Sequence, residues 1–175
     1  MWRIVHIIDA LNRRIGRGVA WAALAMVLVQ FAVVMLRHVF SVGYVAMQEA
    51  VWYLHGILFM VGAGYTLLED GHVRVDVFYR DARPATRALI DLIGAAFLLV
   101  PVCVVIIWLS RAYVLNAVLV LETGGDPAGL PLVFALKAVI WLFALLVGLQ
   151  GVSMALKAWG FLSGMAPHYP PRPGR

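Results

Sequence analysis

The side chains that could do chemistry are few, and most lie at the ends of long apolar stretches. Glu49 stands at the start of one stretch and Lys137 just inside another, while His55 and Gln150 lie well within two of them. Ionisable groups inside a membrane are costly and are therefore functional candidates by default. Glu49 could cap its own helix, where exposed amides stabilise an acid, or pair with Lys137, with Arg37 or with a partner protein.

Lys137 and two glutamines have simple structural interpretations. The stem of Lys137 is long enough to carry its ammonium group to the outer headgroups, which is the alternative to an ion pair. Gln30 and Gln150 are expected to hydrogen-bond to other helices, an interaction that averages about 0.6 kcal/mol in a membrane protein. The glutamines therefore indicate helix packing.

No arrangement of residues in the sequence suggests an enzyme. A bis-histidine haem site needs two histidines facing each other at the same depth in the membrane. Only His55 lies well inside a span, and the other four histidines lie at span ends or outside the spans. Cys103 is the only cysteine, so it is expected to be a small packing residue and not part of a disulfide or a cysteine-based metal site. We therefore expect no catalytic, substrate-binding or metal site and no cofactor.

The composition and the spacing of charges predict the fold class. Of 175 residues, 63% are hydrophobic and 13% charged, against about 45–50% and about 25% in a soluble domain. Four uncharged runs are each close to the ~20 residues that cross a hydrocarbon layer, and lipid requires their backbone amides to be paired internally. We expect an all-α integral membrane protein with four transmembrane helices, at about 17–37, 48–68, 89–111 and 133–156.

The segment before the first run has its own pattern. Ile4, Ile8, Leu11 and Ile15 recur at helical spacing, with polar residues elsewhere around the wheel. This predicts an amphipathic helix over about 2–15 on the cytoplasmic membrane surface, the alternative being a basic leader that only sets topology. The first run is too long for a signal peptide and lacks a small-residue cleavage site, so we expect it to be retained.

The distribution of basic residues predicts the orientation. Of 14 Lys and Arg, only Arg37 and Arg111 flank one side, and Lys137 lies inside the last span. The other eleven are Arg3, Arg13, Arg14, Arg17, Arg74, Arg80, Arg83, Arg87, Lys157, Arg172 and Arg175. The positive-inside rule then places both termini and the loop 69–91 in the cytoplasm. This orientation explains the net charge of +5, so the charge does not indicate a nucleic-acid partner.

Prolines and glycines mark the remaining boundaries. Pro84 suits the first position of the third helix, Pro101 should kink that helix, and its apolar pattern continues beyond Arg111 through Val120. The segment 122–131 is typical of an outward loop, and 71–79 of a partly interfacial piece of the cytoplasmic loop. Residues 1–165 are thus expected to form one four-helix membrane domain, followed by a Pro-rich flexible cytoplasmic tail, 166–175.

Several motifs resemble those of one transporter family. Gly71-His72-Val73-Arg74-Val75-Asp76 is similar to the G-H-I/V-R-V-D signature of the small, Q-type (DctQ-like) membrane subunit of tripartite ATP-independent periplasmic (TRAP) transporters. Arg37-His38-Val39-Phe40 resembles the R-Y-x-F that closes the family's first span, and Gln48-Glu49 the W-x-E-E that opens its second. Gly129-Leu130-Pro131, Lys137 and Leu149-Gln150-Gly151 resemble the last-span pattern of one branch.

The resemblance covers about 19–151, with departures. Met47 and Gln48 stand where the tryptophan and the first glutamate are usual, so any role of that acidic pair rests on Glu49 alone. The last span also lacks the proline that this branch often has after its lysine.

The resemblance implies a multi-pass subunit of the bacterial inner membrane that works with two partners. A periplasmic protein would bind an organic anion, and a large elevator-type subunit would move it with sodium, while this chain packs against the static scaffold without binding substrate. The candidate interface or structural residues are Arg37, Glu49, Gly71, His72, Arg74, Asp76, Lys137 and Gln150. Membrane phospholipid is a further expected partner.

Two alternatives remain at this level. His72, Arg74 and Asp76 are expected to make polar contacts with the large subunit or within the chain, but the loop could instead serve only to turn at Gly71. The chain could also be the membrane anchor of a respiratory or other redox complex, which absorbance in the haem region would reveal.

Overall fold

The computed structural model describes residues 1–73, 79, 82–166 and 168–169, and within them it contains helices and no strand. The elements are α1 (Trp2–Val39), α2 (Val45–Leu68), α3 (Pro84–Ile93), the π-helix η1 (Gly94–Leu99), α4 (Val100–Leu119) and α5 (Val133–Leu162). Because α3, η1 and α4 follow one another directly, they form one long helix. Among the described residues, four helices are therefore long and apolar enough to cross a membrane, which confirms the predicted all-α class and its four candidate spans.

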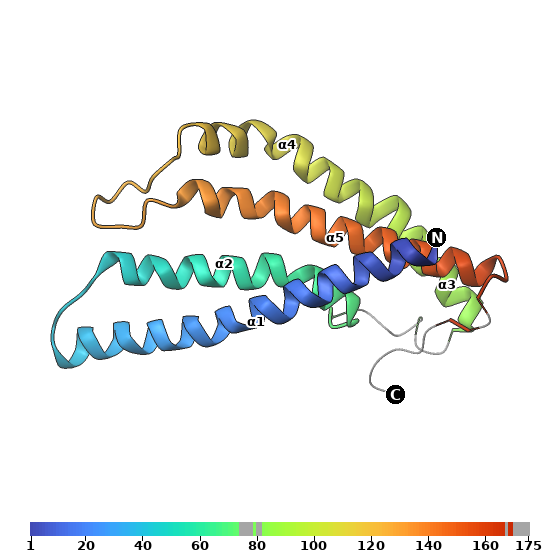
Figure 1. The fold of residues 1–175 in the computed structure, drawn as a ribbon, viewed down its shortest axis with the longest axis horizontal. Coiled ribbons are helices and arrows are strands. Elements are labelled where there is room, and N and C mark those ends of the chain that lie inside the picture. Colours follow the sequence, from blue (N-terminus) through green and yellow to red (C-terminus); the bar gives the residue numbers. More distant parts are fainter. Residues whose placement is uncertain (74–78, 80–81, 167, 170–175) are drawn as a thin grey trace.

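The four long helices lie in one layer in the order α1, α2, α5, α4 (Figure 1). Within the described part of the chain, α4 packs against α5 but against neither α1 nor α2. Near its N-terminus α1 crosses toward α5 and contacts it (Figure 1). The four long helices thus form a flat layer with two broad faces. α5 touches every other long helix and carries the largest share of buried residues.

The first helix differs from the two elements expected there. α1 is continuous over 38 residues, about 57 Å at 1.5 Å per residue, so the expected amphipathic helix over 2–15 is the first part of the spanning helix and not a separate element. Val5, Ile8, Asn12 and Gly16 face the other helices, whereas Ile4 is 53% exposed. The physical reason is packing: a break before the span would remove Gly16 from its contact with α2.

Two prolines lie in the third long helix, one at its start and one near its middle. Pro84 is the first residue of α3, as its missing N–H favours. Pro101 is the second residue of α4, and the wider π-turn of η1 just before it accommodates the carbonyl that the proline ring would otherwise meet four residues earlier. The helix continues beyond Arg111 to Leu119, as the apolar pattern indicated.

Small residues allow the helices to approach closely. Cys103 is 4% exposed and packs with Ala144 and Val147 where α4 meets α5, which fits its expected packing role. A Cβ at Gly148 would lie 3.3 Å from the Cβ of Cys103, and one at Gly16 would overlap the side chain of Tyr65. Close approach between small residues is how membrane helices gain packing energy when lipid removes the hydrophobic driving force.

The contact of Gly16 with α2 gives a first prediction. Gly16→Ala should lower the free energy of unfolding by about 1–3 kcal/mol, because the added methyl group overpacks the interface. Gly18 lies two residues away on the same helix, and a Cβ there would meet nothing within 4 Å, so Gly18→Ala should have no such cost. Thermal unfolding in detergent measures both variants. Equal shifts of the two transitions would contradict the α1–α2 packing.

Candidate functional site

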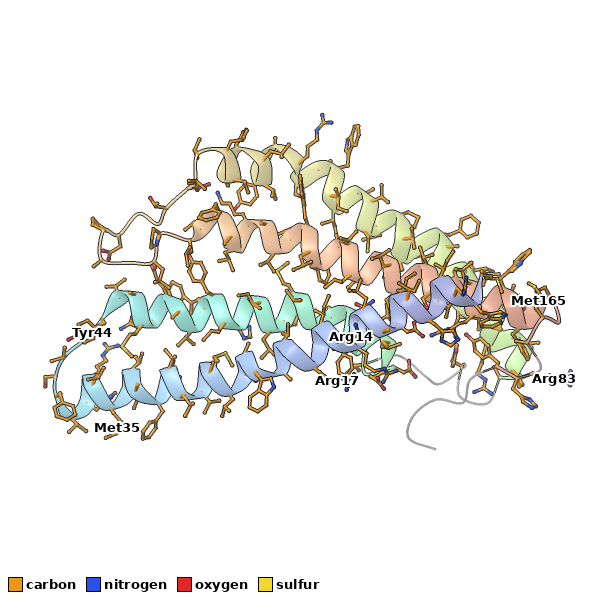
Figure 2. The ribbon with its side chains drawn as sticks, in the orientation of Figure 1. Arg14, Arg17, Met35, Tyr44, Arg83 and Met165 are labelled. Atoms are coloured by element: carbon orange, nitrogen blue, oxygen red, sulfur yellow. The ribbon has the colours of Figure 1, made fainter. Side chains whose placement is uncertain are left out.

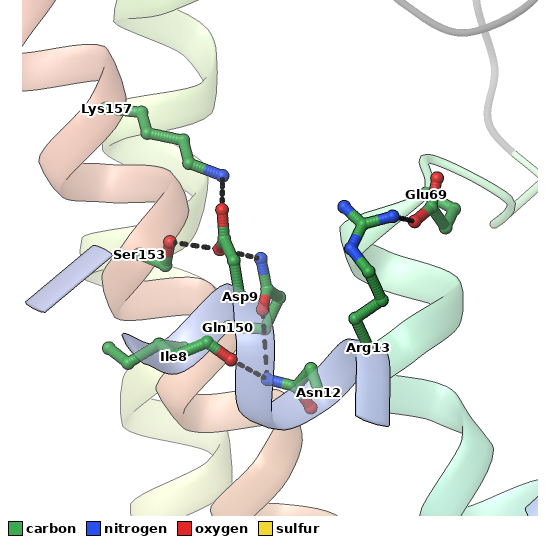
Figure 3. Close-up of polar contacts among 8 residues, drawn as sticks. All are labelled: Ile8, Asp9, Asn12, Arg13, Glu69, Gln150, Ser153 and Lys157. Carbon is green, nitrogen blue, oxygen red and sulfur yellow. Dashed lines mark hydrogen bonds and ion pairs between the residues drawn. The ribbon is translucent and has the colours of Figure 1, made fainter. Parts of the chain in front are cut away.

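A cluster of polar side chains joins α1 to α5 where the two helices cross (Figure 3). We call it the crossing cluster: Asp9, Asn12, Gln150, Ser153 and Lys157. One carboxylate oxygen of Asp9 accepts hydrogen bonds from Ser153 Oγ at 2.7 Å and from Gln150 Nε2 at 3.1 Å. Its other oxygen lies 2.6 Å from the ammonium group of Lys157. Asp9 therefore receives three donors from three successive turns of α5.

Asn12 extends the cluster toward α2. Its Nδ2 donates to Gln150 Oε1 at 2.9 Å and to the backbone oxygen of Ile8 at 3.4 Å. Its Oδ1 is buried without a hydrogen bond to any described residue and points at Gly64, where a Cβ would overlap it. Asn12 is only 1% exposed, so α1, α2 and α5 meet around one amide group.

A second ion pair lies beside the crossing cluster and is more exposed. Arg13 of α1 pairs with Glu69, just after α2 (Figure 3). Their side chains are 47% and 34% exposed, against 25% and 19% for Lys157 and Asp9. Exposed pairs contribute about 0.2–1 kcal/mol, so of these two ion pairs the less exposed Asp9–Lys157 pair is expected to contribute more.

Only part of this cluster was expected from the sequence. Gln150 does bond to another helix, as predicted, whereas Asp9 and Asn12 were assigned to a polar outer face and Lys157 only to topology. The available signal was spacing: Gln150, Ser153 and Lys157 recur at intervals of three and four, which places them on one face of a helix.

At the opposite end of the layer, Glu49 holds a loop. One of its carboxylate oxygens accepts a hydrogen bond from the backbone N–H of Leu130 at 2.6 Å. A Cβ at Gly129 would lie 2.6 Å from both carboxylate oxygens, so only glycine leaves room for the acid there. Because α2 begins at Val45, Glu49 is not in its first turn, and the expectation that it caps its own helix is wrong.

Lys137 has a different partner from those considered in the sequence. Its Nζ lies 2.5 Å from a carboxylate oxygen of Glu122 and 4.2 Å from the ring centre of Tyr113. The backbone oxygen of Glu122 also accepts a bond from the N–H of Phe134, at 3.1 Å. Lys137 thus fastens the start of the loop between α4 and α5, residues 120–132, to α5, while Glu49 fastens the end of this α4–α5 loop to α2.

The signature motif after α2 is described only in part. The N–H of Gly71 donates to the backbone oxygen of Thr66 at 2.8 Å, and the left-handed residue of the turn is Asp70, with φ of 57°, and not Gly71. His72 is exposed. Arg74 and Asp76 lie outside the described residues, as do residues 167 and 170–175 of the tail. From the described part of the tail, Tyr169 donates a hydrogen bond to Asp91 at 2.6 Å.

The remaining candidates face outward. Arg37 is exposed in the last turn of α1, where a cation complements the helix dipole. Gln30 is exposed, and its side chain has no hydrogen bond to any residue that the structure describes, contrary to expectation. His55 is exposed near the middle of α2, with its ring centre 6.3 Å from that of Phe59.

Comparison with known proteins identifies one family. The family model of the DctQ component of the tripartite ATP-independent periplasmic transporters matches residues 26–163. This range contains most of the four long helices and both residues, Glu49 and Lys137, that hold the α4–α5 loop. No curated protein and no solved structure matches the chain.

The crossing cluster gives a second prediction. Asp9→Asn should lower the free energy of unfolding by about 1–3 kcal/mol, because it leaves the ammonium group of Lys157 without its carboxylate. Adding Lys157→Met should restore part of this loss, so the two changes are not additive. Chemical or thermal unfolding of the three variants gives the coupling.

The neighbouring ion pair supplies the control for this prediction. Glu69→Gln should cost at most about 1 kcal/mol because the Arg13–Glu69 pair is exposed. A loss as large as that of Asp9→Asn, or strict additivity in the Asp9 and Lys157 series, would show that the crossing cluster is not what holds α1 on α5.

The acceptor role of Glu49 gives a third prediction. Glu49→Ala should speed hydrogen exchange of the Leu130 amide by roughly tenfold or more, because a charge-assisted hydrogen bond is lost. Gln48→Ala is the matched control, since the Gln48 side chain has no hydrogen bond within the described residues. Exchange–mass spectrometry of the loop measures both, and equal rates in the two variants would refute the assignment.

Proposed function

The chain belongs to the DctQ family of tripartite ATP-independent periplasmic transporters, and from this premise we propose that it is the small scaffold subunit of such a transporter. Its large membrane partner would be the elevator-type carrier, which moves an organic anion with sodium after a periplasmic protein delivers it. In this proposal the present chain binds no substrate and stabilises the part of the carrier that stays still.

The one-layer arrangement is the observation that carries the proposal. A closed bundle would bury its apolar side chains internally, but here large side chains project from the layer along its whole length (Figure 2). Phe59 is 71% exposed, Trp52 69% and Phe97 75%. A broad apolar layer of this kind adds surface to a partner, as a scaffold subunit must.

One face of the layer also carries polar groups at membrane depth. A groove of 640 Å³ crosses this face and is lined by residues of α1, α2, α4 and α5, including Met26, Trp52, His55, Tyr113 and Lys137. Lipid alone would leave the imidazole of His55 without a hydrogen-bond partner, which is costly in hydrocarbon. We assign this face to the large subunit, whose helices can supply a partner.

The polar contacts suit a part that must not deform. The crossing cluster fixes one end of the layer, and Glu49 and Lys137 fix the loop at the other end. An elevator needs a frame that does not tilt or slide while its moving domain crosses the membrane. Four helices fastened at both ends would widen that frame.

The proposed orientation follows from which charges share an end of the layer. Met1 and Trp2 contact Gly160 near the end of α5, so the start of α1 and the end of α5 lie on the same side. That side also holds Arg13, Arg14 and Arg17, whereas Arg37 and Arg111 lie toward the other. The positive-inside rule places the first side in the cytoplasm of the cell.

Deleting this subunit from its transporter should abolish uptake of the transported anion, because the carrier loses its frame. The purified binding protein should still bind the anion normally. Uptake of labelled substrate by cells or proteoliposomes measures the first, and calorimetry the second. Full uptake by the large subunit and the binding protein alone would refute the scaffold role.

A matched pair of tryptophan variants tests which face is used. Trp52→Ala removes an exposed side chain that lines the groove, and Trp108→Ala removes one of similar exposure, 63%, on α4 outside the groove lining. Co-purification of the large subunit should fall with Trp52→Ala and stay unchanged with Trp108→Ala. The reverse result would move the interface to the α4 side.

A further inference from the structure

One exposed face of α1 changes from basic to apolar along its length. Arg17, Trp21, Leu24, Leu28 and Phe31 follow one another at intervals of three and four residues, so they share a face of the helix. We call this face the α1 strip. Trp21 is 71% exposed, Leu24 50%, Leu28 59% and Phe31 64%, so the described part of the chain leaves the strip open.

A polar hollow of 390 Å³ lies at the basic end of the strip, lined by His6, Asp9, Ala10, Arg13, Arg14 and Arg17. The charges of two of these residues are already compensated, since Asp9 pairs with Lys157 and Arg13 with Glu69.

Arg14 and Arg17 project from α1 just before its uncharged run (Figure 2). Within the described residues neither has a carboxylate partner, and Arg17 Nε donates only to the backbone oxygen of Arg13, at 3.3 Å. Two guanidinium groups thus border a hollow without a matching anion.

The apolar part of the strip has the length of one membrane leaflet. Ten residues separate Trp21 from Phe31, which corresponds to about 15 Å of helix, or half of a hydrocarbon core of about 30 Å. Tryptophan is enriched where hydrocarbon meets headgroups. Along the strip the cations therefore come first, then the ring of Trp21 and then apolar side chains. A phospholipid has its headgroup, its interfacial region and its acyl chains in the same order.

We propose that the α1 strip, with the hollow at its basic end, binds an anionic phospholipid. Arg14 and Arg17 hold its phosphate, because guanidinium groups match phosphate oxygens in charge and geometry. An acyl chain lies along Leu24, Leu28 and Phe31. The site is independent of the transporter assignment, because it needs only this chain and a membrane.

Native mass spectrometry of the full chain in detergent, titrated with phosphatidylglycerol, tests the proposal. One phosphatidylglycerol should be retained more tightly than phosphatidylcholine. Arg14→Gln with Arg17→Gln should weaken this binding roughly 30-fold, because each arginine contributes about fivefold to attraction of an anionic lipid. Arg14→Lys with Arg17→Lys should retain most of it.

The control removes the same charge from the same end of the layer. Arg3→Gln with Arg83→Gln, both exposed and outside the hollow, should leave phosphatidylglycerol binding unchanged, with circular dichroism checking the fold of every variant. Equal weakening in the control would overturn the proposal in favour of a general charge effect.

Two further results would also overturn it. Binding of inorganic phosphate that displaces the lipid and is lost in the Arg14 and Arg17 variant would show a free-anion site. Loss of the large subunit from that variant, with lipid binding unaltered, would show that the strip contacts a protein.

Discussion

The arrangement of helices depends first on the carboxylate of Asp9. It takes a hydrogen bond from Ser153, another from Gln150 and an ion pair from Lys157, all from one face of α5. Placing α1 across α5 in this way also brings Asn12 against Gly64 of α2. Because apolar side chains gain little from leaving lipid for each other, a few polar contacts can decide where a membrane helix crosses its neighbour. Without this cluster, α1 and α5 would share only apolar contacts such as those of Met1 and Trp2 with Gly160.

A layer fixed in this way differs from a closed bundle in what it leaves open. Since α4 packs against neither α1 nor α2 within the described residues, few side chains lie between more than two helices, and most apolar groups face lipid or a partner. The two ends of the α4–α5 loop are each held by a single acid, Glu49 or Glu122. Polar contacts at the two ends of the layer fix its shape, and the apolar side chains in its middle remain exposed. This arrangement suits the proposed role of a subunit that supports another protein.

The sequence was sufficient for the elements and insufficient for their contacts. Uncharged runs near 20 residues and Pro84 predicted the helices because lipid forces backbone amides to pair locally. The crossing of α1 was missed because Ile4, Ile8, Leu11 and Ile15 form an apolar stripe by themselves, and nothing local shows that Val5, Asn12 and Gly16 face protein instead. Lys137 was given Glu49 as a candidate partner, but the path of the loop brings Glu122 to it first.

His55 supports the proposal that a partner covers the grooved face of the layer. An imidazole near the centre of a span has either a polar neighbour or a high cost, and within the described residues the ring only lies beside Phe59. The ionisable side chains of the crossing cluster and of the α4–α5 loop are at the ends of the layer, where water or another acid or base is close. His55, exposed at mid-depth, instead lies on the grooved face, beside Trp52 and Met26. A partner that covers the groove gains apolar contact area and at the same time can supply a hydrogen bond to the imidazole. Both contributions to the binding free energy therefore favour the same docking face.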